Sequence, residues 1–176
     1  MTTSKWTSQD LPDQTGRTIV VTGANSGIGL IAARELARAG GRVVLAVRDE
    51  GRGREAAESI EGATEVRRLD LADLASVRAF ADGWDGQIDV LINNAGVMAV
   101  PEKRTADGFE MQIGTNHLGH FALANLLLPR ISDRVVVLSS GAHRMGSIRL
   151  DDLTGSAAAT SAGAHTASPS SRTCSS

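Results

Sequence analysis

The sequence predicts an α/β protein with a doubly wound, parallel sheet and helices on both faces. Apolar strand-like runs alternate with helix-like segments from about residue 17 to residue 141. The strand-like runs are nearly continuous Val, Ile and Leu, which is typical of strands covered on both faces. A glycine-rich turn, TGANSGIG, joins the first run to the first helix-like segment. Because such alternation requires parallel strands with right-handed crossovers, we expect one layered domain.

The expected elements follow one another without internal repeats. Aliphatic and β-branched residues concentrate in five expected strands, at 17–23, 42–48, 64–71, 88–96 and 134–141. Apolar residues recur at helical spacing, or polar ones dominate one face, in four expected helices, at 26–41, 50–62, 74–84 and 107–130. Asp73 is a candidate N-cap of the third helix, and Gly40–Gly41 ends the first.

Composition divides the chain into three regions. Residues 1–16 are polar and turn-rich, and we interpret them as an N-terminal arm. Residues 17–154 form the expected Rossmann-like domain, which we expect to be incomplete at its C-terminal side. Residues 155–176 consist largely of Ala, Ser, Thr and Gly without apolar periodicity, so we expect this tail to be disordered.

Charge and hydropathy narrow the possible partners. The net charge is −2 and no Lys/Arg run follows a phosphate-like spacing, so we expect no nucleic-acid partner. No stretch approaches about 18 consecutive apolar residues, and no apolar signal region opens the chain, so we expect no membrane span. The single cysteine, Cys174, agrees with a reducing cytoplasm, and we expect a cytoplasmic location.

The glycine-rich turn suits a dinucleotide. Gly23 permits a tight turn, Gly27 lets a pyrophosphate approach the backbone, and Gly29 lets the helix pack closely. The helix N-terminus offers N–H groups and a positive dipole end to phosphates. The spacing is G-x-x-x-G-x-G rather than G-x-G-x-x-G, so a ligand-free βα turn remains the alternative. Its place between a strand and a helix favours dinucleotide binding.

The end of the second expected strand bears on the choice of cofactor. Arg48 stands there, about where an acidic residue would bind the ribose 2′-hydroxyl of NAD. An arginine at this point accommodates the 2′-phosphate of NADP, so we expect NADP(H) to be preferred over NAD(H). Asp49 follows directly and keeps NAD(H) open, and a solvated strand-end arginine is the structural alternative.

Several short motifs together resemble one enzyme family. TGANSGIG, LDL, NNAG, the Asn116 of TNHLGH and LSS occur in the order and approximate spacing of the short-chain dehydrogenase/reductase superfamily. The segments AVRDE, TNHLGHFAL and SSGAHRMG most resemble its branch of retinol dehydrogenases and protochlorophyllide-reductase-like enzymes. The resemblance covers about residues 15–154. It implies an NADP(H)-dependent oxidoreductase that transfers hydride between nicotinamide and a small alcohol or carbonyl substrate.

The resemblance also implies a role for individual cofactor-binding positions. The residues expected at the pyrophosphate are Gly23, Ser26, Gly27, Ile28 and Gly29. Those expected near the adenosine ribose and its 2′-phosphate are Asn25, Ser26 and Arg48. Asp70 and the backbone of Leu71 would contact the adenine. The cofactor ribose would be lined by Asn94, Ala95 and Gly96.

For catalysis the resemblance implies two residues of a tetrad. Asn116 would hold a water in the proton relay, and Ser140 would hydrogen-bond the substrate oxygen. His117 and His120 lie three residues apart but have no third ligand nearby, so we expect no metal site. An intact member of the family is expected to be a homo-oligomer.

The other half of the implied tetrad has no counterpart in these residues. The family uses a Y-x-x-x-K pair after the serine, whereas the 176 residues contain no tyrosine, and the lysines Lys5 and Lys103 both precede Ser140. General acid–base catalysis of this kind contributes about 10²–10⁴-fold in rate. We therefore expect the chain to be inactive or nearly so.

The tail suggests a cause. Written back into codons and read two bases later, residues 155–176 can encode a segment containing Y-G-Q-S-K. We therefore expect a frameshift near Thr154–Gly155 and an out-of-frame tail. Three alternatives stay open: a broken reductase gene, a sequence error in an intact reductase, or a non-catalytic NADP(H)-binding pseudoenzyme.

The loss of a covering helix would have physical consequences. The fifth strand should become a sheet edge, which invites pairing with other chains. The face of the fourth helix around Phe121, Leu123, Leu126 and Leu127 should become an exposed apolar patch. We expect the chain to be prone to aggregation.

Overall fold

The protein folds around a parallel sheet of five strands with the order β3-β2-β1-β4-β5. The computed structural model describes residues 6–98 and 100–141. The strands are β1 (Thr18–Thr22), β2 (Arg42–Val47), β3 (Thr64–Arg68), β4 (Ile88–Asn93) and β5 (Ile131–Val137). The order reverses direction between β1 and β4, so the predicted doubly wound α/β fold is confirmed. The expected tail 155–176 and the boundary at residue 154 lie outside the described residues.

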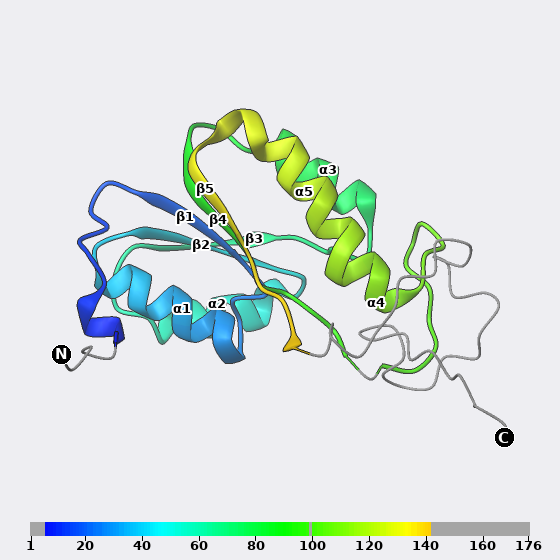
Figure 1. Cartoon of the computed structure of the whole chain (residues 1–176), viewed down its shortest axis with the longest axis horizontal. Helices are drawn as coiled ribbons and strands as arrows, with labels where there is room; N and C mark the ends of the chain where they lie inside the picture. Colours follow the sequence, from blue (N-terminus) through cyan, green and yellow to red (C-terminus); the bar gives the residue numbers. More distant parts are fainter. Residues whose placement is uncertain (1–5, 99, 142–176) are drawn as a thin grey trace, which may run out of the picture.

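Helices cover both faces of this sheet (Figure 1). α1 (Gly27–Arg38) and α2 (Glu50–Glu58) lie on one face, and α3 (Leu74–Asp82) and α5 (His120–Leu127) lie on the other. The shorter helical segments are η1 (Ser8–Asp10), α4 (Met111–Ile113), η2 (Gly114–Gly119) and η3 (Leu128–Arg130). The Asp73 carboxylate accepts a hydrogen bond from the Ala75 N–H at 2.9 Å, which confirms the predicted cap of α3.

The core forms two layers because successive side chains of β1 point to opposite faces of the sheet. Val20 packs with the α3 and α5 side, where Leu91, Phe80 and Trp84 are buried. Ile19 and Val21 pack with the α1 and α2 side. β1 is therefore covered on both faces, as its apolar run predicted.

The expected helix at 107–130 is shorter and less regular than its sequence suggests. It begins at Met111, because the buried Glu110 carboxylate accepts hydrogen bonds from the Gln112 and Ile113 N–H groups, both at 2.9 Å. It then passes through a π-helical turn, η2, before α5 begins. A Cβ on Gly119 would overlap the carbonyl oxygen of Leu71. Glycine there lets the helix backbone touch the loop that follows β3.

The expected apolar patch on this helix was wrong in part. Leu123 and Leu127 are fully buried, because residues four apart share one helix face and this face meets the core. Phe121 is 63% exposed and Leu126 41% exposed. β5 lies at the edge of the sheet and begins at Ile131 rather than at 134. Its residues are exposed or only half-buried.

The residues before β1 lie against the body of the domain. Gln14 is buried, and its N–H donates to the Ala39 carbonyl at 2.7 Å. Arg38 donates to the Ser8 carbonyl at 2.9 Å. Within the described ranges, no helix has the length and apolar character needed to cross a membrane.

Candidate functional site

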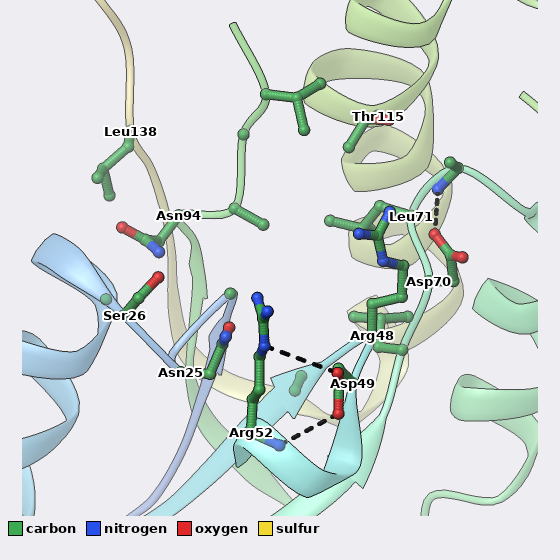
Figure 2. A pocket seen from close by; sticks show the side chains of 18 of the residues that line it. Asn25, Ser26, Arg48, Asp49, Arg52, Asp70, Leu71, Asn94, Thr115 and Leu138 are labelled. Carbon is green, nitrogen blue, oxygen red and sulfur yellow. Dashed lines mark hydrogen bonds and ion pairs between the residues drawn. The ribbon is translucent and has the colours of Figure 1, made fainter. Parts of the chain in front are cut away.

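A cavity of about 480 Å³ opens at the carboxyl ends of β1, β2 and β4, where ligands bind in open α/β sheets (Figure 2). Its wall includes the predicted cofactor residues Gly23, Asn25, Ser26, Ile28, Gly29, Arg48, Asp70, Leu71, Asn94, Ala95 and Gly96. Of that predicted set, Gly27 alone does not line the cavity. Residues that the sequence did not single out also line it, among them Arg52, Val97, Thr115 and Leu138.

The glycine turn forms one wall of the cavity. Gly23 has φ +66° and Gly27 has φ +56°, a backbone region that side chains with a Cβ disfavour. A Cβ on Gly29 would overlap the Asn94 side-chain nitrogen and lie 2.8 Å from the Gly23 carbonyl oxygen. Ser26 precedes α1 without a side-chain hydrogen bond to the helix. The turn therefore leaves the helix N-terminus accessible from the cavity, as a bound pyrophosphate requires.

Two arginines approach the cavity beyond the glycine turn. In Figure 2 the side chains of Arg48 and Arg52 both rise toward the middle of the cavity, with Asp49 between their bases. The Asp49 carboxylate caps α2 by accepting the Arg52 N–H at 3.1 Å, and lies 3.9 Å from the Arg52 Nε. All three side chains are exposed, and an exposed ion pair is weak. Neither guanidinium is therefore strongly committed within the protein.

Arg52 was missed in the sequence because it stands on the next element. Only the first turn of α2 brings its side chain back beside Arg48. The available signal was the spacing, since residues three and four apart on a helix share a face.

The loop after β3 closes the opposite side of the cavity. The Asp70 carboxylate accepts the Ala72 N–H at 3.0 Å, and the Asp70 N–H donates to the Ser76 hydroxyl at 3.0 Å. Leu71 is buried and rests against Gly119. The loop is held by its own hydrogen bonds and presents Asp70 at the cavity wall.

Thr22 ties the glycine turn to the segment after β4. Its buried hydroxyl accepts hydrogen bonds from the N–H groups of Asn94 and Ala95, both at 2.9 Å. The Asn94 side chain in turn donates to the Thr22 carbonyl at 2.8 Å. Thr22 is the last residue of β1, and its partners lie 72 and 73 residues away in the chain. No local pattern in the sequence revealed this role.

The two predicted catalytic residues differ in where the structure places them. The Asn116 side chain lies in the π-helical turn and forms two hydrogen bonds with the Val97 backbone, at 2.8 Å each. It thereby fixes a residue of the cavity wall. Ser140 follows β5, is exposed and does not line the cavity, whereas Leu138 does.

The two histidines of the helical segment separate. His117 is exposed and stacks on Phe121 with ring centroids 6.3 Å apart. His120 is buried, with its Nε2 2.9 Å from the Thr22 hydroxyl. Among residues 6–98 and 100–141, no group of three His, Cys, Asp or Glu side chains is arranged to hold a metal ion.

The sequence is similar to known oxidoreductases. The family model described as short chain dehydrogenase matches residues 17–167. Retinol dehydrogenase 12 of Bos taurus is 52% identical over 152 residues, which cover 80% of this chain and 48% of that protein. The chain therefore spans about half the length of this curated relative.

Solved structures agree in fold. A putative uncharacterized protein from Mycobacterium Paratuberculosis superposes with a TM-score of 0.87 at 61% identity, covering 90% of this chain and 59% of that one. Pseudomonas aeruginosa RhlG, solved with NADP, gives a TM-score of 0.66 at 27% identity, with coverage of 81% and 60%. A Burkholderia phymatum short chain dehydrogenase/reductase, solved with NAD, gives 0.64 at 28% identity, with coverage of 75% and 52%.

Three findings agree: a doubly wound parallel sheet, a glycine turn that opens on the switch-point cavity, and a family match over most of the sequence. Its relatives place the likeness in the branch of retinol dehydrogenases. The chain belongs to the short-chain dehydrogenase family.

Proposed function

We propose that these 176 residues form the NADP(H)-binding part of an oxidoreductase that acts on a small alcohol or carbonyl compound. The observation that carries the proposal is the pair of arginines, Arg48 and Arg52, at the cavity beyond the glycine turn. The family match supports the reaction class, and the cavity supports binding of a dinucleotide. The nicotinamide cofactor, when bound, supplies or accepts the hydride.

The residues of this chain would divide the cofactor between them. The N-terminus of α1, with Gly23 and Gly29 giving it room, would hold the pyrophosphate. Asp70 would face the adenine from the loop after β3. Asn94 and Ala95, fixed by Thr22, would line the ribose next to the nicotinamide.

A preference for NADP(H) follows from charge at the adenosine end. Arg48 and Arg52 together offer two guanidinium groups to a 2′-phosphate, which binds arginine through charge-assisted hydrogen bonds. Asp49 lies at the same place and is the group that would favour a 2′-hydroxyl. Solved relatives include complexes with each cofactor, so the balance within this trio decides the preference.

Proton transfer is the part of the reaction that these residues do not complete. They include no tyrosine, and Lys5 and Lys103 both precede Ser140. We propose that this chain binds the cofactor and turns over slowly or not at all by itself. A frameshift near Thr154–Gly155 would explain the tail, and a non-catalytic NADP(H)-binding protein is the alternative.

Sequencing the gene from the codon of Arg149 onward separates these origins. A reading frame that runs on through Y-G-Q-S-K after correction of one inserted or deleted base would indicate an intact reductase. The recorded sequence with that motif in a shifted frame would indicate a broken gene. Absence of the motif from every frame would contradict the frameshift and leave the cofactor-binding alternative.

Titration of the chain with NADPH and NADH tests the cofactor proposal directly. We expect NADPH to bind at least about 10-fold more tightly than NADH, since each charge-assisted hydrogen bond contributes about 1.5–3 kcal/mol. Arg52→Gln and Arg48→Gln should each weaken NADPH binding by about 10-fold and change NADH binding little.

The matched control is Arg54→Gln, because Arg54 is exposed on the same helix but does not line the cavity. It should leave both affinities unchanged. Equal binding of NADPH and NADH by the wild-type chain, or equal loss of both in the Arg52 variant, would contradict the proposed preference.

A further inference from the structure

His120 is a buried titratable side chain that the proposed function does not use. It is the first residue of α5 and is 5% exposed. Its Nδ1 lies 3.1 Å from the carbonyl oxygen of Asn116, and its Nε2 lies 2.9 Å from the Thr22 hydroxyl. The ring therefore bridges the π-helical turn and the end of β1.

The partners of the ring determine which nitrogen carries the proton. The Asn116 carbonyl oxygen can only accept, so Nδ1 must be the donor. The Thr22 hydroxyl oxygen already accepts two N–H groups, from Asn94 and Ala95, which occupy both of its lone pairs. It therefore has one remaining role, which is to donate its own proton.

Two acceptors compete for the proton of the Thr22 hydroxyl. His120 Nε2 is at 2.9 Å and the Ile92 carbonyl oxygen is at 3.4 Å, so the histidine is the better acceptor. A charged imidazolium would instead direct a third donor at the Thr22 oxygen. The geometry thus selects a neutral ring with the proton on Nδ1. Burial, which lowers the pKa of His120, acts in the same direction.

We propose that His120 is a positioning residue whose neutral, Nδ1-protonated ring aims the Thr22 hydroxyl at the Asn94–Ala95 turn and ties that turn to Asn116. One hydrogen-bonded chain then runs from the Asn116 carbonyl through His120 and Thr22 to the cavity wall. Asn116 also holds Val97 through its side chain, so both ends of the 94–97 segment depend on this unit. The proposal rests on the proposed function only in assigning that segment to cofactor binding.

The tautomer is tested without any cofactor. Long-range ¹H–¹⁵N NMR of the histidine rings distinguishes an Nδ1–H ring from an Nε2–H ring, and His120→Gln identifies which signals belong to His120. We expect one histidine with a protonated Nδ1 and a bare Nε2 at neutral pH. An Nε2–H ring, or averaging between the two tautomers, would overturn the proposal.

Two substitutions separate positioning from packing. Asn places its amide near the Nδ1 position, so His120→Asn keeps a donor for Asn116 but removes the acceptor for Thr22. Gln reaches the Nε2 position, so His120→Gln keeps that acceptor. We expect His120→Asn to weaken NADPH binding by about 10-fold, the effect of one hydrogen bond, and His120→Gln by less than about 3-fold.

The Thr22 variants complete the cycle. Thr22→Ser retains the hydroxyl and Thr22→Val removes it, so His120→Asn should weaken binding in the first background and add little in the second. Circular dichroism spectra confirm that each variant is folded. Equal losses in His120→Asn and His120→Gln, or additive losses with Thr22→Val, would show that the ring merely fills space. If the wild-type chain binds no NADPH, the proposed function fails, while the NMR result still decides the tautomer.

Discussion

β1 and β5 are similar in sequence and opposite in surroundings. β1 reads TIVVT and is buried along four of its five residues, whereas β5 reads ISDRVVV and is exposed or half-buried throughout. β1 pairs with β2 and β4, and helices cover both of its faces. β5 pairs with β4 alone within the described part of the chain. Aliphatic runs therefore predict that a segment is a strand, and its neighbours in space decide how deeply it is buried.

The same contrast runs through α5. Leu123 and Leu127 face the core that β1 shares, while Phe121 and Leu126 face away from it. Val136 and Val137 of β5 are likewise exposed, at 38% and 65%. Stability should therefore depend on the centre of the sheet and be insensitive to its β5 edge.

The largest expected effect is the loss of a central side chain. Leu127→Ala should lower the free energy of unfolding by about 2–5 kcal/mol, because Leu127 is fully buried. Leu126→Ala, on the same helix at 41% exposure, should cost under about 1 kcal/mol. Urea denaturation followed by circular dichroism measures both. Similar losses for the two variants would contradict the assignment of the helix faces.

The glycine turn is the next most sensitive place. Gly29→Ala should cost about 1–3 kcal/mol, since its Cβ would overlap the Asn94 side chain, and it should also weaken NADPH binding. Gly27→Ala meets no atom within 4 Å but has φ +56°, so only backbone strain of about 1–2 kcal/mol applies. Thermal unfolding and NADPH titration follow both variants. Wild-type affinity in Gly29→Ala would show that Asn94 need not keep its place.

A moderate effect is expected on acidification. Burial lowers the pKa of His120 below its ordinary 6.5, and the hydrogen bond to Asn116 opposes this only in part. As pH falls below about 6.5, the unfolded chain takes up a proton that the folded chain does not. Stability should therefore fall, by at most about 1.4 kcal/mol per pH unit, until the folded ring is protonated as well.

The pH window separates His120 from the carboxylates. Hydrogen bonding from Arg134 holds the pKa of Asp133 below 3.8, so its contribution to stability is lost only at more acidic pH. Urea denaturation at several pH values between 5 and 7 measures the slope. The slope should be smaller in His120→Gln, and an unchanged slope would indicate that another group is responsible.

The smallest effect on stability should come from the exposed edge. Val137→Lys should change the free energy of unfolding by no more than about 0.5 kcal/mol, because Val137 is 65% exposed. It should nevertheless reduce self-association, since a charge on an edge strand disfavours pairing with another chain. Val135→Lys is the contrasting variant, because Val135 packs against the core. Analytical ultracentrifugation would reveal an edge-independent association if Val137→Lys left it unchanged.

The sequence predicted those parts of the site that are local. The glycine turn, the strand that precedes it and Arg48 are recognisable within a few neighbouring residues. The strands were placed correctly in order because each is one short aliphatic run. Their ends were set too far, as at 64–71, where β3 ends at Arg68. Chain polarity changes there without a marked change in apolar pattern.

The parts that depend on distant contacts could not be predicted. The hydrogen bond of Thr22 with His120 joins residues 98 apart in the chain. The break at η2 depends on Gly119 meeting Leu71 and on Asn116 holding Val97, neither of which leaves a local pattern. The apolar run around Leu123 correctly indicated a helix, but which side chains are buried followed from the packing of α5 on the core.

Amide hydrogen exchange with and without NADPH tests the central claim most directly, because it reads the site and the edge in one experiment. We predict that NADPH slows exchange in 23–30 and 94–97, which form the glycine turn and the segment held by Thr22. Exchange in β5 should be fast and insensitive to the cofactor, while β1 should be protected throughout. Unchanged exchange in both segments at saturating NADPH, or protection confined to β5, would contradict the assignment of the cavity as the cofactor site.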